Sequence, residues 1–86
     1  MIARLTSMHA RVLVTLRRGV LDPHGQSVRA SLNKLGFGEV KDARIGKVIE
    51  FELDDMPKDE ARKRLEAMAK QLLANTVIED FLVEVL

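Results

Sequence analysis

Two histidines, His9 and His24, are the side chains of this sequence best suited to acid–base chemistry. A nucleophilic triad needs a serine or cysteine beside a histidine base that an acid orients. The chain has no cysteine, and neither histidine has a partner at a recognisable spacing. We therefore predict structural roles for both histidines and no catalytic residue in this chain.

Metal and phosphate chemistry find equally little support. A metal site needs several clustered ligands, whereas the neighbouring Asp54 and Asp55 are better explained as negative charge near the start of a helix. Gly19 and Gly25 flank an expected helix start, but the sequence contains neither G-x-x-x-x-G-K-[ST] nor G-x-G-x-x-G, the glycine patterns that cradle phosphates. We predict that this chain alone binds no metal and no cofactor.

The composition limits the class of protein. The 86 residues suffice for one domain, and 47% of them are hydrophobic, enough for a packed core. Lys and Arg number 14 against 13 Asp and Glu, so the basic surplus typical of nucleic-acid binding is missing. No apolar run approaches the roughly 18 residues of a membrane span, so we expect a cytoplasmic protein. Because so short a chain buries only about 60% of its surface and has no disulfide, we expect it to self-associate as a dimer or tetramer.

Local signals then place the first elements. Residues 10–18 alternate between apolar and polar, which predicts a strand. We interpret residues 1–9 as a frayed extension, or as upstream sequence before a start at Met8, and residues 10–86 as a single domain. Asp22 is suited to cap a helix whose first residue is Pro23, and Gly36 to end it in a left-handed conformation.

Residues 40–53 decide the architecture. Two short strands with a hairpin at Gly46-Lys47 would give a ferredoxin-like βαββαβ domain. The apolar residues instead keep odd positions throughout, so the alternation passes Gly46 without a phase slip. We predict one long strand, kinked at Gly46, that pairs partly outside its own monomer, because roughly 45 Å exceeds the usual strand.

The second half predicts a helix and a strand. After Pro57 the apolar positions recur as one helical stripe: Ala61, Leu65, Met68, Ala69 and Leu72. Asn75 is expected to end this helix in the left-handed conformation, and residues 77–86 alternate like a strand.

The resulting fold class is α+β. We expect a two-layer βαβαβ sandwich, related to the ferredoxin-like fold, in which two helices cover one face of a three-stranded, antiparallel-type sheet. The other face keeps four apolar side chains, Leu13, Val48, Ile78 and Leu82. Such a face usually meets another sheet.

Four ordered motifs resemble one family. They are residues 16–25 (LRRGVLDPHG), 35–37 (LGF), 44–50 (RIGKVIE) and 72–79 (LLANTVIE). Together they resemble PurS, the small subunit of bacterial and archaeal phosphoribosylformylglycinamidine synthase. The resemblance runs from about residue 10 to the C-terminus, with His24 where the family commonly has glutamine.

The resemblance implies a role in purine biosynthesis. The complex converts formylglycinamide ribonucleotide, glutamine and ATP into formylglycinamidine ribonucleotide, glutamate, ADP and phosphate. In the family the large subunit PurL holds the ATP and ribonucleotide sites and uses Mg²⁺, the subunit PurQ hydrolyses glutamine, and PurS assembles them. The resemblance therefore implies a non-catalytic subunit of a ligase complex.

Two further hypotheses concern binding. The alternative function is a small-ligand-binding regulatory α+β domain with residues 19–25 as its loop. Arg17, Arg18 and Lys47 have no role in capping, and we expect them to meet an acidic surface of the large subunit. Neither nucleic acid nor membrane is expected as a partner.

Overall fold

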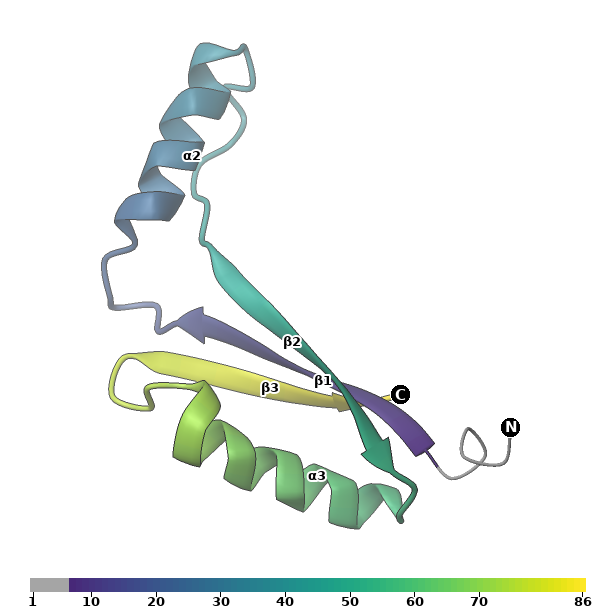
Figure 1. Ribbon diagram of the computed structural model, residues 1–86. Helices are drawn as coiled ribbons and strands as arrows, with labels where there is room; N and C mark the ends of the chain where they lie inside the picture. The colour runs from purple at the N-terminus through teal and green to yellow at the C-terminus, as the bar shows by residue number, and fades with distance from the viewer. Residues whose placement is uncertain (1–6) are drawn as a thin grey trace.

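The computed structural model describes residues 7–86, which form a three-stranded sheet, one helix against it and one helix beyond its end (Figure 1). The elements follow in the order β1 (Ser7–Leu16), α2 (Pro23–Lys34), β2 (Gly46–Asp54), α3 (Lys58–Met68), the π-helical turn η1 (Ala69–Leu73) and β3 (Glu79–Val85). The α+β class and the βαβαβ order predicted from sequence are confirmed.

The sheet has the order β2-β1-β3, with both outer strands antiparallel to β1. Val12 of β1 lies opposite Ile49 on one side and Val83 on the other, and these three side chains share a face. Val12 and Val83 belong to the buried core, and Ile49 packs against it. The alternation read from the sequence thus sets which residues of each strand are buried.

Helix α3 covers this apolar face. Ala61, Leu65 and Ala69 are fully buried, as the predicted stripe requires. The stripe then changes phase, because the Ala74 N–H bonds the Ala69 carbonyl five residues earlier, at 2.9 Å. Ala74 is therefore buried, whereas Leu72, predicted to face the core, is 84% exposed.

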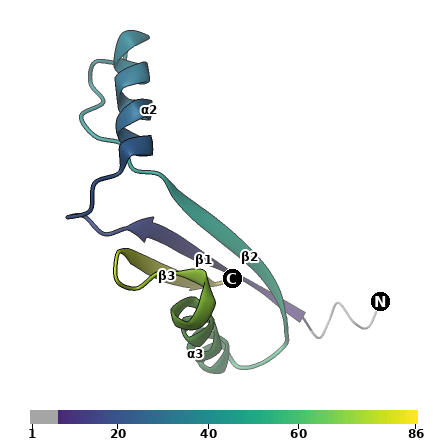
Figure 2. The same cartoon turned by 60° about the vertical axis from the view of Figure 1, so that its left-hand side comes forward.

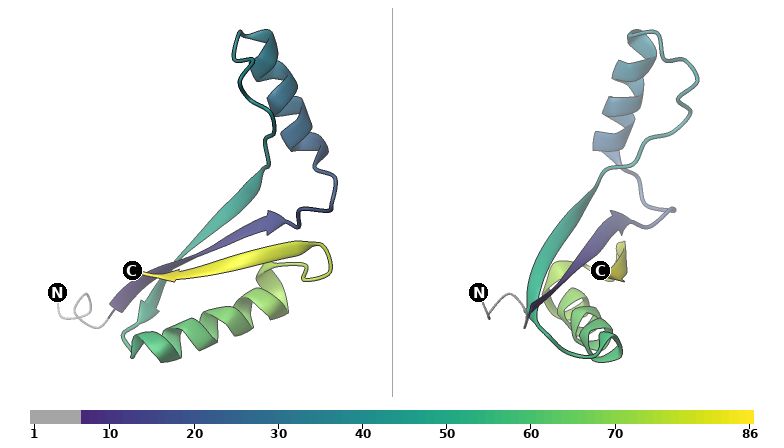
Figure 3. Two further views of the ribbon diagram at one scale, coloured as in Figure 1. Left: turned by 180° about the vertical axis from the view of Figure 1, so that it is seen from behind. Right: turned by 90° about the vertical axis from the view of Figure 1, so that its right-hand side faces the viewer.

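Helix α2 does not join α3 on that face, which corrects the expectation of two helices on one side of the sheet. It projects from the end of the sheet in every view (Figures 1, 2 and 3). The reason is topological. Antiparallel neighbours such as β1 and β2 can be joined at one end of the sheet, so the chain through α2 need not cross it. Strands β2 and β3 run in the same direction on either side of β1, so α3 must cross the sheet.

Strand β2, the second along the chain, is shorter than predicted. It begins at Gly46, opposite Thr15, close to the end of β1 at Leu16. Residues 40–45 therefore have no strand of the described chain to pair with. They run back along α2, where the Asn33 side chain donates to the Val40 carbonyl at 3.2 Å. The prediction of one strand without a hairpin at Gly46 is right, but a strand over residues 40–53 is wrong.

Two further boundaries differ from expectation. Strand β1 begins at Ser7, and Met8 is buried opposite Leu53, so residues 7–9 belong to the sheet and not to a frayed extension. Residues 1–6 lie outside the described part of the chain. Asn75 is not left-handed; its side-chain oxygen accepts from the Val77 N–H at 3.1 Å and shapes the turn before β3.

The ends of α2 match the sequence signals. The Asp22 carboxylate accepts from the Gly25 N–H at 2.9 Å, and Pro23 occupies the first turn. At the other end Gly36 has a φ of 106°, and the Phe37 N–H bonds the Leu32 carbonyl at 3.0 Å. This bond makes a Schellman ending. Gly36 has the left-handed conformation that the sequence predicted, because a residue without Cβ adopts that φ readily.

Candidate interaction surfaces

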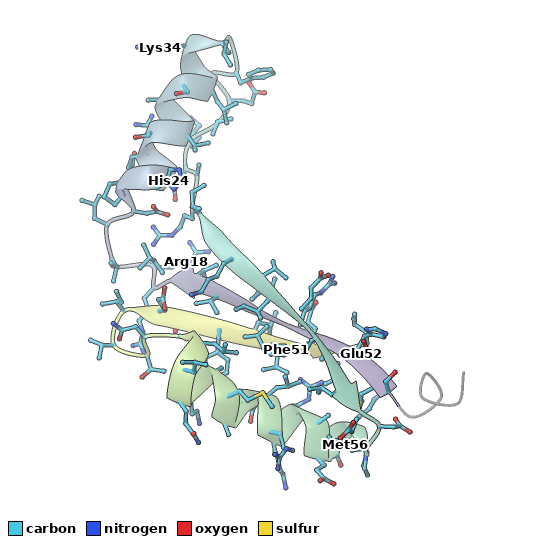
Figure 4. The ribbon with its side chains drawn as sticks, viewed as in Figure 1. Arg18, His24, Lys34, Phe51, Glu52 and Met56 are labelled. Carbon is cyan, nitrogen blue, oxygen red and sulfur yellow. The ribbon has the colours of Figure 1, made fainter. Side chains whose placement is uncertain are left out.

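The three cations predicted to meet a partner gather near the end of the sheet from which α2 projects. Within residues 7–86, one of them forms an ion pair and the side chains of the other two have no hydrogen-bond or ion-pair partner. Arg17 forms an ion pair with Asp80, with 3.5 Å between Nε and Oδ1, and also donates to the Thr76 carbonyl. It therefore connects the end of β1 both to the start of β3 and to the turn before it. Arg18 lies near the end of β1 (Figure 4) and is exposed. Residues 7–86 offer its side chain no hydrogen bond or ion pair. Lys47 is exposed on the edge strand β2.

A pocket of about 300 Å³ lies beside these residues. Both acidic and basic side chains line it, among them Asp22, His24, Lys47 and Glu79. Figure 4 places His24 at the base of α2. In the part of the chain that the structure describes, no group of three or more His, Cys, Asp or Glu side chains is placed to hold a metal ion.

Asp22 does more than the capping that its sequence position predicts. It is only 4% exposed, and its second oxygen accepts from the Ile45 N–H at 2.8 Å. Hydrogen bonds from the Gly25 and Ile45 N–H groups hold the pKa of Asp22 below its usual value, and the nearby Arg44 and His24 act in the same direction. One carboxylate thus joins the start of α2 to the chain that returns from it.

Arg44 ties the same region from the other side. Its Nη2 donates to the carbonyls of Arg17 at 2.9 Å and Val20 at 3.0 Å. Gly25 allows the two chain segments to meet, because a Cβ there would lie 2.1 Å from the Ala43 carbonyl oxygen. Sequence reasoning missed this cluster; its only signal was that residues 16–25 and 44–50 both carry motifs.

Among residues 7–86, no helix or strand covers the face of the sheet opposite α3. Val48, Leu13 and Leu82 lie in one row across the three strands, and Val48 and Leu82 are 56% and 58% exposed. In the next row Arg11 lies between Glu50 and Glu84 and forms an ion pair with Glu84. The hydrogen bond and charge of Glu84 raise the pKa of Arg11. An apolar row beside a charged row suits recognition of another protein surface.

The described residues also contain no helix long and apolar enough to cross a membrane. The described residues form a small α+β domain with surfaces suited to binding other proteins. These surfaces are the uncovered sheet face, the projecting helix α2 and the cationic end, which is formed by Arg18 and Lys47.

Residues 9–86 match the model of the family PurS: Phosphoribosylformylglycinamidine (FGAM) synthase. A curated relative from Synechocystis, "Phosphoribosylformylglycinamidine synthase subunit PurS", is 47% identical over 79 residues, covering 92% of this chain and 79% of the relative. The PurS structure of Bacillus subtilis aligns with a TM-score of 0.78 at 40% identity, over 91% of this chain and 96% of that one. A chain of "PurLQS from Thermotoga maritima" aligns with a TM-score of 0.84 at 29% identity, over 93% and 98%. The chain belongs to the PurS family, as its motifs indicated.

Proposed function

We propose that this chain is the assembly subunit of phosphoribosylformylglycinamidine synthase in purine biosynthesis. It pairs with a second copy of itself, joins the synthetase subunit PurL to the glutaminase subunit PurQ, and carries out no chemical step. ATP and Mg²⁺ are then used by PurL. The apolar row of Leu13, Val48 and Leu82 on an uncovered sheet face carries the proposal, and the PurLQS structure of a relative supports it. A cytoplasmic location remains a prediction.

Self-association through the open sheet face is tested by sedimentation at micromolar concentration. Leu82→Asp places a charge at the β3 end of the apolar row and should convert a dimer or tetramer into monomers. Leu72→Asp is the matched control, because Leu72 is more exposed and lies on η1, outside this face. A wild-type chain that sediments as a monomer and unfolds cooperatively would contradict the proposal.

The assembly role is tested by reconstitution. The purified chain should have neither amide-transfer nor ATPase activity, and it should restore glutamine-dependent synthesis when mixed with PurL and PurQ. Glutamine-dependent synthesis by PurL and PurQ at an undiminished rate without this chain would contradict the role.

The cationic end is the proposed contact with an acidic surface of PurL. Arg18→Glu with Lys47→Glu should slow association with PurL, and more so at low salt, because screening weakens long-range attraction. Arg17 is left unchanged because it connects β1 to β3 and to the turn before it. Lys63→Glu with Lys70→Glu gives the same charge change on exposed positions of α3 and η1. Equal slowing by both pairs would mean that net charge, and not this surface, matters.

The small-ligand alternative has one observation in its favour, the pocket lined by Asp22, His24 and Lys47 beside residues 19–25. A ligand that binds only the folded chain raises its unfolding temperature. Thermal unfolding with glutamine, ATP or formylglycinamide ribonucleotide would favour this function only if one of them stabilises the isolated chain.

A further inference from the structure

Two parts of the molecule meet at a narrow neck. We call α2 together with residues 35–41 the arm; it stands apart from the sheet and α3 (Figures 1 and 3). The chain enters the arm through residues 17–22, the incoming segment, and leaves it through residues 42–45, the outgoing segment. These two segments form the neck. The direction of the arm therefore depends on contacts within the neck, because α2 itself does not lie on the sheet.

The neck contains the one buried charged side chain among residues 7–86, that of Asp22. Burying a carboxylate is costly unless hydrogen bonds satisfy it, and helix capping alone requires only one of its oxygens. The second oxygen bonds Ile45, one residue before β2. Serine or asparagine would cap α2 equally well, so capping does not account for the second bond.

Arg44 crosses the neck in the opposite sense. It belongs to the outgoing segment and donates to the carbonyls of Arg17 and Val20 on the incoming one. Asp22 belongs to the incoming segment and accepts from the outgoing one. The two side chains therefore bond reciprocally across the neck.

We propose that Asp22 and Arg44 form a latch that fixes the direction of the arm relative to the sheet. The latch sets where the exposed tip of the arm, with Leu35 and Phe37 73% and 48% exposed, lies relative to the sheet. This inference concerns the chain alone, so it stands or falls separately from the proposed function.

The test measures the arm directly. The chain has no cysteine, so Ser31→Cys on the arm and Lys63→Cys on α3 give two unique sites for spin labels. Labelled chains diluted with unlabelled ones report the distance within one protomer. Wild-type latch residues should give one narrow distance distribution.

Asp22→Ser keeps a good helix cap but removes the oxygen that reaches Ile45. We expect the distance distribution to broaden and the Ile45 amide to lose its protection from hydrogen exchange, while circular dichroism still shows α2. Arg44→Gln should broaden the distribution as well. Asp42→Ser is the matched control, an exposed aspartate of the outgoing segment that bonds only its neighbour's N–H within the described chain.

Asp22→Asn is a second variant that keeps a helix cap, because asparagine also caps well. Its amide nitrogen replaces one of the two carboxylate oxygens and can only donate, so one of the two hydrogen bonds is lost. Unchanged distances in Asp22→Ser and Asp22→Asn would overturn the latch and leave Asp22 as a cap. Loss of α2 in both variants would also overturn it, because the carboxylate would then be needed for the helix itself.

Discussion

Gly25→Ala tests how closely α2 approaches the chain that returns from it. In an ordinary helix this substitution stabilises by up to about 1 kcal/mol, because alanine loses less backbone freedom on folding. Here the new Cβ would lie 2.1 Å from the Ala43 carbonyl oxygen and 2.9 Å from a carboxylate oxygen of Asp22. Both distances are shorter than any real contact of this kind, so the substitution should destabilise instead.

The magnitude follows from the space available. Ordinary contact begins at 3.4 Å, so the Ala43 carbonyl must retreat by more than about 1 Å. Its segment is held two residues later by the bond from Ile45 to Asp22. A retreat of this size lies in the upper part of the about 1–3 kcal/mol that overpacking costs. After a propensity gain of up to about 1 kcal/mol we expect a net loss of about 1–2 kcal/mol. For a domain of this size each kcal/mol lowers Tm by roughly 4–8 °C.

The assay is thermal unfolding at one fixed protein concentration, because self-association makes Tm depend on concentration. Hydrogen exchange should place the loss of protection in α2 and residues 43–45. Ser27→Ala is the control: it lies on an exposed position of the same helix and should be neutral or slightly stabilising. A Gly25→Ala chain as stable as the wild type would refute this close approach.

Three further outcomes are expected. Leu65→Ala removes a fully buried side chain and should cost about 2–5 kcal/mol in urea unfolding, whereas Leu72→Ala at an exposed position should stay within about 0.5 kcal/mol; equal losses would mean that η1 does not shift the stripe. The pKa of Asp22 is lowered from 3.8 in the folded chain, so its stabilisation is complete above that pH and is lost as the pH falls through the lower folded value. The stability difference between wild type and Asp22→Ser should therefore hold from pH 7 to about pH 4 and shrink below, and a difference that grows on acidification would contradict this assignment. His24→Gln should leave the activity of the reconstituted complex nearly intact, and a large loss would assign His24 a chemical role.

Local interactions explain what could be predicted from the sequence alone. The cap at Asp22 and Pro23 and the Schellman ending at Gly36 involve residues at most five apart, so their signals lie together in the chain. The alternation in β1 and the stripe of Ala61 and Leu65 likewise record which side chains face the core. The four motifs identified the PurS family. The contact of Arg18 and Lys47 with PurL remains a prediction.

Pairing between residues far apart in the sequence decided the position of α2, the start of β2 and the second role of Asp22. Nothing near α2 in the sequence indicates that β2 returns beside β1, and this pairing is what releases α2 from the sheet. The same pairing starts β2 at Gly46, opposite Thr15, although the alternation of apolar residues continues before it. Asp22 seemed fully explained as a cap because Ile45, its second partner, is 23 residues away in the sequence. Only the tertiary structure brings such groups together, because a periodic pattern records which face a side chain occupies and not which strand lies beside it.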